Sequence, residues 1–490
     1  MNLELVLGTH PPTNAAKTSM NRSKTLVACH KLLLRCYSQG KSQLKINGTH
    51  YDTHPEFTNI SGTVLSLSDR ALHLKAAHPI GILRKQIEDK LNSTSDSYCV
   101  YNNFRPVVTV EENFDSLGFP SDHPGRSKSD TYYVNDKHLF RTHTSAHEME
   151  CFGNIKGFTT RESPRAPTDK PGFLISADVY RRDEIDRTHY PVFHQMEGAR
   201  VWKRSQEPVP QGTEPLHIQQ LRFDLQTLEE QLHQENTNLV VHDDISLEQN
   251  PKQDYMSDLE VSLCSQHLKR SIELLVAQVF NKKLASMRAA GSNTQLQVRW
   301  IKAYFPWTAP SWEIEVFWQG EWLELCGCGL VREQVLLNAG YKPDNQIGWA
   351  FGLGLDRIAM LLFEVPDIRL FWTMDDRFHS QFHEGQITKF KPYSKYPGTI
   401  RDVAFWLPQD QRQKAIHEND LMEIVREKAG DLVESVKLVD KFTHPKTNKK
   451  SLCYRINYQS MDRNLTNDEI NQIQENVREE LVNKYGVTLR

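Results

Sequence analysis

Two strand-like segments joined by a charged loop constrain the fold of this chain more than any other feature. Residues 173–181 and 193–201 have the pattern of strands, residues 182–190 between them are mostly charged, and Pro191 ends the loop. Strand patterns bounded by turn signals in this way predict an antiparallel hairpin with a long tip. The fold must therefore contain an antiparallel sheet.

Other strands cluster near the middle of the chain, among helices. Strand patterns fall at residues 298–304, 312–318 and 322–328. Helices are expected at residues 78–91, at residues 257–279 after a capping box (Ser257 to Glu260), and after Gly354. Because strands and helices do not alternate regularly, the order predicts an α+β domain built on an antiparallel sheet.

Residues 206–255 differ in composition from their surroundings, being rich in Gln, Glu, Asp and Asn. They predict an acidic insertion with one amphipathic helix, whose apolar stripe is Leu221, Leu225, Leu228 and Leu232. A coiled coil is the alternative, but this stripe is shorter than the three or four heptads that a coiled coil requires. Further on, residues 376–393 are expected to form a linker.

The last segment has its own order of elements. A strand at 400–407, a helix at 419–429, strands at 433–442 and 451–458, and a helix opened by a capping box (Thr466 to Glu469) precede a short strand at 487–489. This βαββαβ order predicts a ferredoxin-like module, which occurs with many functions.

The first 51 residues contain one acidic side chain, Glu4, and several basic ones among Ser and Thr. This composition is typical of a mitochondrial transit peptide, which we place at residues 1–37. A disordered basic tail is the alternative. The apolar run at 26–34 is interrupted by His30 and Lys31, so it is too short and too charged to span a membrane.

Charge and cysteine content exclude some classes of protein. A net charge of -3 argues against a protein that coats nucleic acid nonspecifically, so any contact with RNA must be regional. The eight cysteines have neither disulfide-framework nor zinc-ligand spacing, which fits a reducing compartment. Cys326 and Cys328 are expected to be small strand residues on one face.

The hairpin is also the best candidate for a functional site. Period-two geometry places Phe193, Gln195 and Glu197 on one face of the returning strand, and Arg181 lies at the end of its partner. A carboxylate and an amide can hold an ammonium group, and an arginine can bind a phosphate with two hydrogen bonds. From spacing alone, a surface sheet with mixed polar residues explains the pattern equally well.

Longer motifs distinguish the two interpretations. They are Val179 to Asp183 with Thr188 to Gly198, Pro106 to Val108 with Asn113 to Asp115, Asp122 to Pro124, Arg141 to Ser145, Tyr304 to Pro306, Trp322 to Leu325, and Gly348 to Arg357. In their order along the chain they resemble the single-chain, mitochondrial-type phenylalanyl-tRNA synthetases of class II, over roughly residues 75–490 without the insertion. The resemblance implies a class II catalytic domain at 38–393 and a ferredoxin-like anticodon-binding domain at 394–490.

It also implies a reaction and its partners. Phenylalanine and ATP would form phenylalanyl-adenylate, and the acyl group would pass to tRNA(Phe) in the mitochondrial matrix. Arg181 and Arg357 would be catalytic and hold the α- and γ-phosphates, His189 would contact phosphate, Phe193 and Phe351 would lie near the adenine, and Glu324 could help to hold Mg²⁺. Substrate contacts are also expected from Ser145, Ala146, His147, Glu148, Thr188, Tyr190, Gln195, Met196, Glu197, Phe305, Trp307 and Ala350.

The chain departs from the family pattern at three places. Trp307 stands where a phenylalanine is usual in the wall of the phenyl pocket, and Asp183 and Asp356 stand where glutamate is common. Two rival functions remain: a catalytically silent paralogue, against which Arg181, Glu197 and Arg357 argue, and a synthetase for another amino acid. We expect a monomer.

Overall fold

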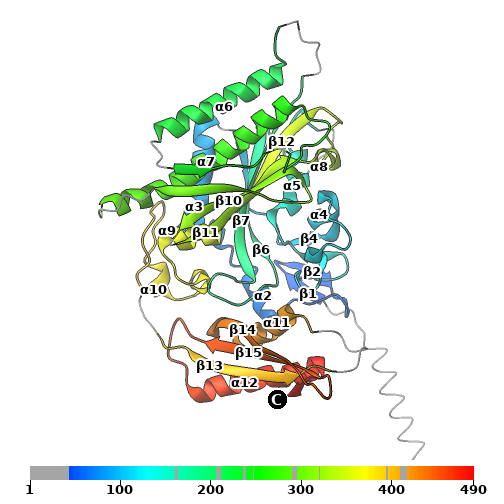
Figure 1. The fold of residues 1–490 in the computed structure, drawn as a ribbon, viewed down its shortest axis with the longest axis vertical. Helices are drawn as coiled ribbons and strands as arrows, with labels where there is room; N and C mark the ends of the chain where they lie inside the picture. The colour runs from blue at the N-terminus through cyan, green and yellow to red at the C-terminus, as the bar shows by residue number, and fades with distance from the viewer. Residues whose placement is uncertain are drawn as a thin grey trace, which may run out of the picture.

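A sheet of eight strands forms the centre of the larger domain in the computed structural model (Figure 1). The strand order is β3-β6-β7-β12-β11-β10-β9-β8, antiparallel except for the parallel edge pairs β3/β6 and β8/β9. The bounds are Tyr98–Tyr101 (β3), Gly172–Tyr180 (β6), Val192–Lys203 (β7), Leu239–His242 (β8), Leu296–Lys302 (β9), Thr308–Trp318 (β10), Glu321–Val331 (β11) and Gln346–Gly354 (β12). The α+β class and the hairpin, which is β6 and β7, are confirmed.

The structure describes residues 43–95, 97–159, 164–205, 210, 212–235, 239–246, 248–289, 295–318, 320–392, 396–408 and 416–490. The predicted leader at residues 1–37 lies outside these ranges. Within them, none of the helices combines the length and the apolar character needed to cross a membrane.

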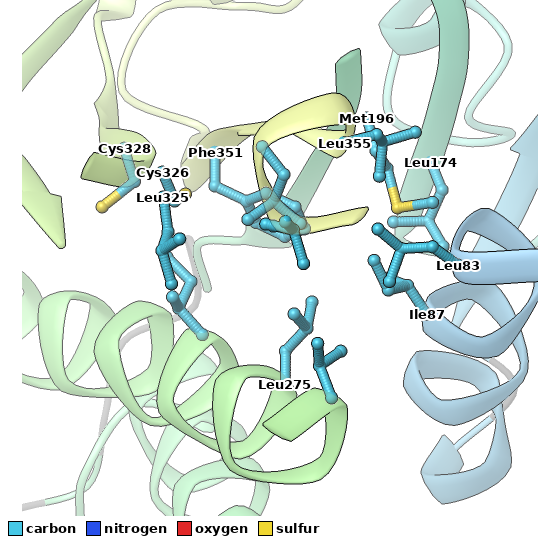
Figure 2. Close-up of a cluster of buried hydrophobic side chains, with 14 of the residues drawn as sticks. Leu83, Ile87, Leu174, Met196, Leu275, Leu325, Cys326, Cys328, Phe351 and Leu355 are labelled. Carbon is cyan, nitrogen blue, oxygen red and sulfur yellow. The ribbon is translucent and has the colours of Figure 1, made fainter. Parts of the chain in front are cut away.

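Helices α3 (Pro79–Ser95), α7 (Asp258–Ala289) and α9 (Leu355–Phe363) contribute to the main core. Figure 2 shows Leu83 and Ile87 of α3 beside Leu174 of β6 and Met196 of β7, with Leu275 of α7 below the same cluster. The capping box of α7 is confirmed, because the Glu260 amide donates to Ser257 Oγ and the Ser257 amide donates to Glu260 Oε2.

A smaller core contains the alternate residues of the same strands. Phe173 and Ile175 flank Leu174 on β6, and they pack with Phe152 of α5 (Glu148–Gly153) and Leu336 of α8 (Glu333–Asn338). Successive side chains of a strand point to opposite faces, so both faces of the sheet are covered. Short elements complete the domain: β1 (Gln43–Ile46), β2 (Thr49–Asp52), α2 (Gly62–Leu67), η1 (Leu72–Leu74), β4 (Val107–Thr109), α4 (Val110–Asn113), η2 (Asp115–Leu117), η3 (Pro124–Arg126), β5 (His138–Phe140), η4 (Thr144–His147) and η5 (Ile368–Trp372).

The segment expected to be a linker belongs to the larger domain instead. It contains helix α10 (Asp376–His379), and Phe378, Phe382 and Phe390 are buried in the main core. Burial of three phenylalanine side chains removes apolar surface from water and stabilises the folded domain. A linker exposed to solvent gains no such free energy. The prediction of a linker over the described residues 376–392 was therefore wrong.

The acidic segment carries the expected helix, α6 (Leu216–Gln234). Leu221, Leu225 and Leu228 are buried, and α6 lies against α7 in Figure 1 rather than in an extended coiled coil. The sequence did not predict that this segment also supplies β8, which pairs in parallel with β9 at the edge of the sheet.

The C-terminal module is ferredoxin-like, as predicted. Its elements are β13 (Thr399–Trp406), α11 (Glu418–Ala429), η6 (Gly430–Leu432), β14 (Val433–Thr443), β15 (Lys450–Tyr458), α12 (Asn467–Tyr485) and β16 (Thr488–Leu489), with strand order β14-β15-β13-β16. Thr466 caps α12 by accepting from the Glu469 amide, but the Glu469 carboxylate pairs with Arg463, so only half of the capping box forms.

Polar contacts join the module to the larger domain. Buried Arg369 donates to the carbonyls of Asp431, Val433 and Gln459 at 2.9, 2.8 and 3.1 Å. The loop between β6 and β7 takes part as well, because the Val436 amide donates to the Ile185 carbonyl at 3.0 Å. The module thus directly contacts the tip of the hairpin.

Candidate active site

Two adjoining cavities open on the hairpin. The aromatic cavity, about 160 Å³, is lined by His143, Thr144, Ser145, Glu148, Arg181, Gln195, Glu197, Phe305, Trp307, Thr308, Glu324, Gly327, Cys328, Ala350, Phe351 and Gly352. The loop cavity, about 270 Å³, is lined by Arg181, Asp183, Thr188, His189, Tyr190, Phe193, Gln195, Glu324, Leu325, Gly352, Gly354, Asp356, Arg357 and Ile368. Arg181, Gln195 and Glu324 line both cavities, so one molecule in each could react at their junction.

Rings form one wall of the aromatic cavity. Phe305 and Trp307 are 5.7 Å apart between ring centroids, and Trp307 stacks on Phe119 at 5.2 Å. Gly327 permits this arrangement, because a Cβ there would lie only 2.6 Å from Phe305 Cζ. Buried Ala350 lines the same cavity. A flat apolar side chain fits such a wall.

Polar groups gather at Glu197, which is buried. Its Oε2 accepts hydrogen bonds from Ser145 Oγ at 2.6 Å and from Thr144 Oγ1 at 2.9 Å. Gln195 Oε1 accepts from the Thr144 amide at 3.4 Å. Hydroxyls and an amide beside a carboxylate can hold a polar group that carries a positive charge.

A β-bulge places Glu324 in the site. Ile314 pairs with Cys326 and Glu315 pairs with Glu324, so Leu325 is the extra residue on β11. A bulge changes which face the following side chains take. Glu324 and Gly327 therefore both line the aromatic cavity, although their odd spacing would place them on opposite faces of a regular strand.

The two predicted arginines flank the loop cavity. Arg181 Nε donates to the Thr142 carbonyl at 2.8 Å, and its guanidinium lies 5.4 Å from the Phe193 ring centroid. Arg357 is held loosely, 3.9 Å from Glu324 Oε2, and its side chain is 41% exposed. Arg357 also donates to the Glu324 carbonyl at 3.2 Å. Both guanidinium groups retain donors for an anionic ligand.

The hairpin tip adds a further positive group. His189 Nδ1 lies 2.8 Å from Asp186 Oδ2, and this hydrogen bond raises the pKa of His189 above its usual value. The same contact helps to lower the pKa of Asp186, although burial opposes the change. Thr188 and Tyr190 flank His189 and line the same cavity. A protonated His189 adds to the attraction of an anion by the arginines.

Most of the predicted site residues meet here, but three side chains line neither cavity. Met196 points into the main core (Figure 2), because it lies between Gln195 and Glu197 on an alternating strand. Ala146 is buried in a separate core, and His147 stacks on Phe104 at 4.0 Å. Phe351 also differs from expectation, since it lines the aromatic cavity whereas Phe193 lines the loop cavity.

Sequence reasoning did not assign His143 or Thr144 to the site. Both belong to the motif from Arg141 to Ser145, which was recognised without a role for each residue. Burial and then the nearby Arg181 lower the pKa of His143 to about 3, so its ring is neutral. Thr144 was overlooked because nothing in its local sequence indicates that it reaches Glu197, 53 positions away.

Family comparisons agree with this geometry. Residues 64–206 and 260–382 match the model of the class II core domain (F) of tRNA synthetases, and residues 394–490 match the ferredoxin-fold anticodon-binding domain. The fold and the matched domains define a class II aminoacyl-tRNA synthetase.

Comparison with individual relatives shows which family of class II synthetases the chain resembles. The mitochondrial phenylalanine–tRNA ligase of Saccharomyces cerevisiae is 64% identical over 465 residues, which cover 94% of this chain and 97% of the relative. The mitochondrial phenylalanine–tRNA ligase of Mus musculus is 38% identical over 460 residues, 91% of this chain and 88% of the relative. The chain belongs to the mitochondrial phenylalanine–tRNA ligase family.

Proposed function

We propose that this chain joins phenylalanine to tRNA(Phe) in two steps, with phenylalanine bound in the aromatic cavity and ATP in the loop cavity. The assignment rests on the position of Arg181. This residue lines both cavities, at the place where an amino-acid carboxylate and an α-phosphate would meet. Phenylalanine-dependent exchange of pyrophosphate into ATP tests it. Absence of exchange with phenylalanine would contradict it.

In the first step a phenylalanine carboxylate oxygen attacks the α-phosphorus, and the bond to the β-phosphate oxygen breaks to release pyrophosphate. Arg181 stabilises the charge that builds on the α-phosphate, and Arg357 with His189 binds the leaving phosphates. Glu197, Ser145 and Gln195 hold the amino acid by its ammonium group. In the second step a ribose hydroxyl of the tRNA's terminal adenosine takes the acyl group, and AMP leaves.

Mg²⁺ would be bound mainly by ATP oxygens with Glu324. Among the described residues no group of three or more His, Cys, Asp or Glu side chains could hold a metal by itself. One carboxylate with substrate phosphates suits Mg²⁺, and the Glu324 side chain is 52% exposed. The ion would neutralise phosphate charge.

Residues 394–490 would bind the anticodon. Between Lys437 and Arg463 the module has seven basic residues and two acidic ones, and the lysines near the β14–β15 turn are exposed. A locally basic face suits an RNA backbone. We propose that the protein is a monomer, and sedimentation velocity tests this.

The mitochondrial matrix is the compartment that we propose, with residues 1–37 as its import signal. Relatives are named as mitochondrial, and these residues carry several basic side chains and one acidic one. We expect a fluorescent reporter fused to residues 1–37 to be imported into the matrix. The matched control is the same fusion with glutamate in place of Lys17, Arg22, Lys24, Lys31 and Arg35. A cytosolic signal from the unaltered fusion would refute the assignment.

Ala350→Gly should widen the specificity of the aromatic cavity. The Ala350 methyl group would limit the depth available at the para position, and tyrosine would also have to bury a hydroxyl, which costs about 1 to 3 kcal/mol without a partner. Removal of the methyl should raise activation of para-chlorophenylalanine about tenfold relative to phenylalanine, and tyrosine should gain less. Exchange kinetics with the three substrates measure this. An unchanged ratio would mean that the ring does not face Ala350.

A further inference from the structure

Glu148 is a buried acid for which the proposed mechanism gives no role. It is the first residue of α5, its relative exposure is 0%, and it lines the aromatic cavity. Neither of its carboxyl oxygens accepts a hydrogen bond from an N–H or hydroxyl group in the described part of the chain. A buried carboxylate without such partners is strongly disfavoured.

A second buried acid, Glu197, lines the same cavity. Two hydroxyls donate to Glu197 Oε2, whereas Oε1 has no such donor. Both carboxyl groups line the aromatic cavity, each has at least one oxygen without a donor among the described residues, and burial raises the pKa of both. The proximity of Glu197 raises the pKa of Glu148 further, while a hydrogen bond from Glu148 lowers the pKa of Glu197. Two adjacent carboxyl groups in such a place cannot both be ionised at little cost.

Charged groups around the pair do not change this conclusion. His143 is neutral because its pKa is lowered to about 3, and Cys151, which interacts with both acids, is a protonated thiol because burial raises its pKa. Arg181 and Glu324 line the same cavity with opposite charges. Ser145, Thr144 and Gln195 are the uncharged polar groups that line the cavity beside the pair.

We propose that Glu148 is a positioning residue that stays protonated and donates a hydrogen bond to Glu197 Oε1, leaving Glu197 as the one negative charge that meets the substrate's ammonium group. The inference rests on the proposed function, since it assigns the ammonium to Glu197. With one proton shared, a single cation neutralises the pair. The site is then matched to a substrate with one ammonium group.

The pH dependence of KM for phenylalanine tests the proposal. Its acid limb is the pH range in which KM rises as the pH falls. Phenylalanine binding requires ionised Glu197, so KM for phenylalanine rises as the pH falls through the pKa of Glu197. Glu148→Gln keeps a donor to Glu197 and should move the midpoint of this limb by less than about 0.3 pH unit. Glu148→Leu removes the donor, so the pKa of Glu197 should rise and the midpoint should move up by about one pH unit.

An ionised Glu148 predicts the opposite result. Glu148→Gln would then remove a like charge from Glu197, so the midpoint would move down and KM at neutral pH would increase; this outcome overturns the proposal. An unchanged midpoint in folded Glu148→Leu overturns it too. If wild-type enzyme shows no phenylalanine-dependent exchange, the proposed function fails and the inference with it, whereas a shifted Glu148→Gln profile in an active enzyme contradicts the inference alone.

Infrared difference spectroscopy gives a readout that does not depend on activity. Free wild-type enzyme at pH 7 should show the carbonyl stretch of a protonated carboxyl group, and Glu148→Gln should lose that band. This measurement also decides the matter if Glu148→Leu does not fold. A band that is present equally in both proteins would contradict the assignment of the proton to the pair.

Discussion

Arg181→Ala is expected to lower phenylalanine-dependent pyrophosphate exchange by about a hundredfold or more while leaving the fold intact. The guanidinium lies where the two cavities join, and its Nε donates a hydrogen bond to the Thr142 carbonyl. Loss of one preorganised donor to a transition state typically has an effect of this size. Exchange rates at saturating substrates, with thermal melting of both proteins, measure it.

Two further variants make the test specific. Arg181→Lys keeps the charge but loses the planar fork, so its activity should lie between those of wild type and Arg181→Ala. Arg401→Ala, at a half-buried arginine of the C-terminal module, should be almost neutral for exchange. Near-normal exchange by folded Arg181→Ala would rule out the role given to this residue.

Removal of residues 394–490 is expected to lower charging of tRNA(Phe) by at least about a hundredfold, because RNA affinity depends strongly on contacts between basic residues and phosphate. Exchange should fall by a smaller factor. The module contacts the hairpin tip, where Tyr190 donates to Asp431 at 2.7 Å and Arg426 donates to the Asp183 carbonyl at 2.9 Å. The truncated chain loses these contacts, which help to fix a wall of the loop cavity.

Charge reversal in the intact chain separates RNA binding from domain contact. Lys441, Lys446, Lys449 and Lys450 are exposed at the β14–β15 turn, away from the contacts with the catalytic domain. Their replacement by Glu should impair charging and leave exchange near the wild-type rate. If charging survived both this change and the truncation, the anticodon-binding role would be incorrect.

Local sequence patterns predicted the elements that depend on interactions between residues close together in the sequence. The hairpin, α7 with its capping box, and the βαββαβ module all have apolar spacing and caps that can be read within one segment. The motif at residues 193–198 predicted the site residues on β7. Successive side chains of a strand point to opposite faces, which explains why Met196 in this motif faces the core.

Long-range contacts could not be read in this way. The bulge at Leu325 depends on the pairing of β11 with β10, and strict alternation gives no sign of it. The segment of β8 forms a strand because it pairs with the edge strand β9. Residues 376–392 join the core because Phe378, Phe382 and Phe390 pack against apolar residues that are distant in the sequence. The pair formed by Glu148 and Glu197 joins residues 49 positions apart, and tertiary packing brings them together, since α5 and β7 both contribute to the smaller core.

Pyrophosphate exchange with purified enzyme and each of the twenty amino acids in turn tests most directly whether this chain activates phenylalanine. We expect exchange that depends on phenylalanine, with a much lower rate for tyrosine and rates near background for the other amino acids. No exchange with any amino acid would indicate a silent paralogue, and a clear preference for another amino acid would show that the aromatic cavity selects a different substrate; either result would contradict the assignment.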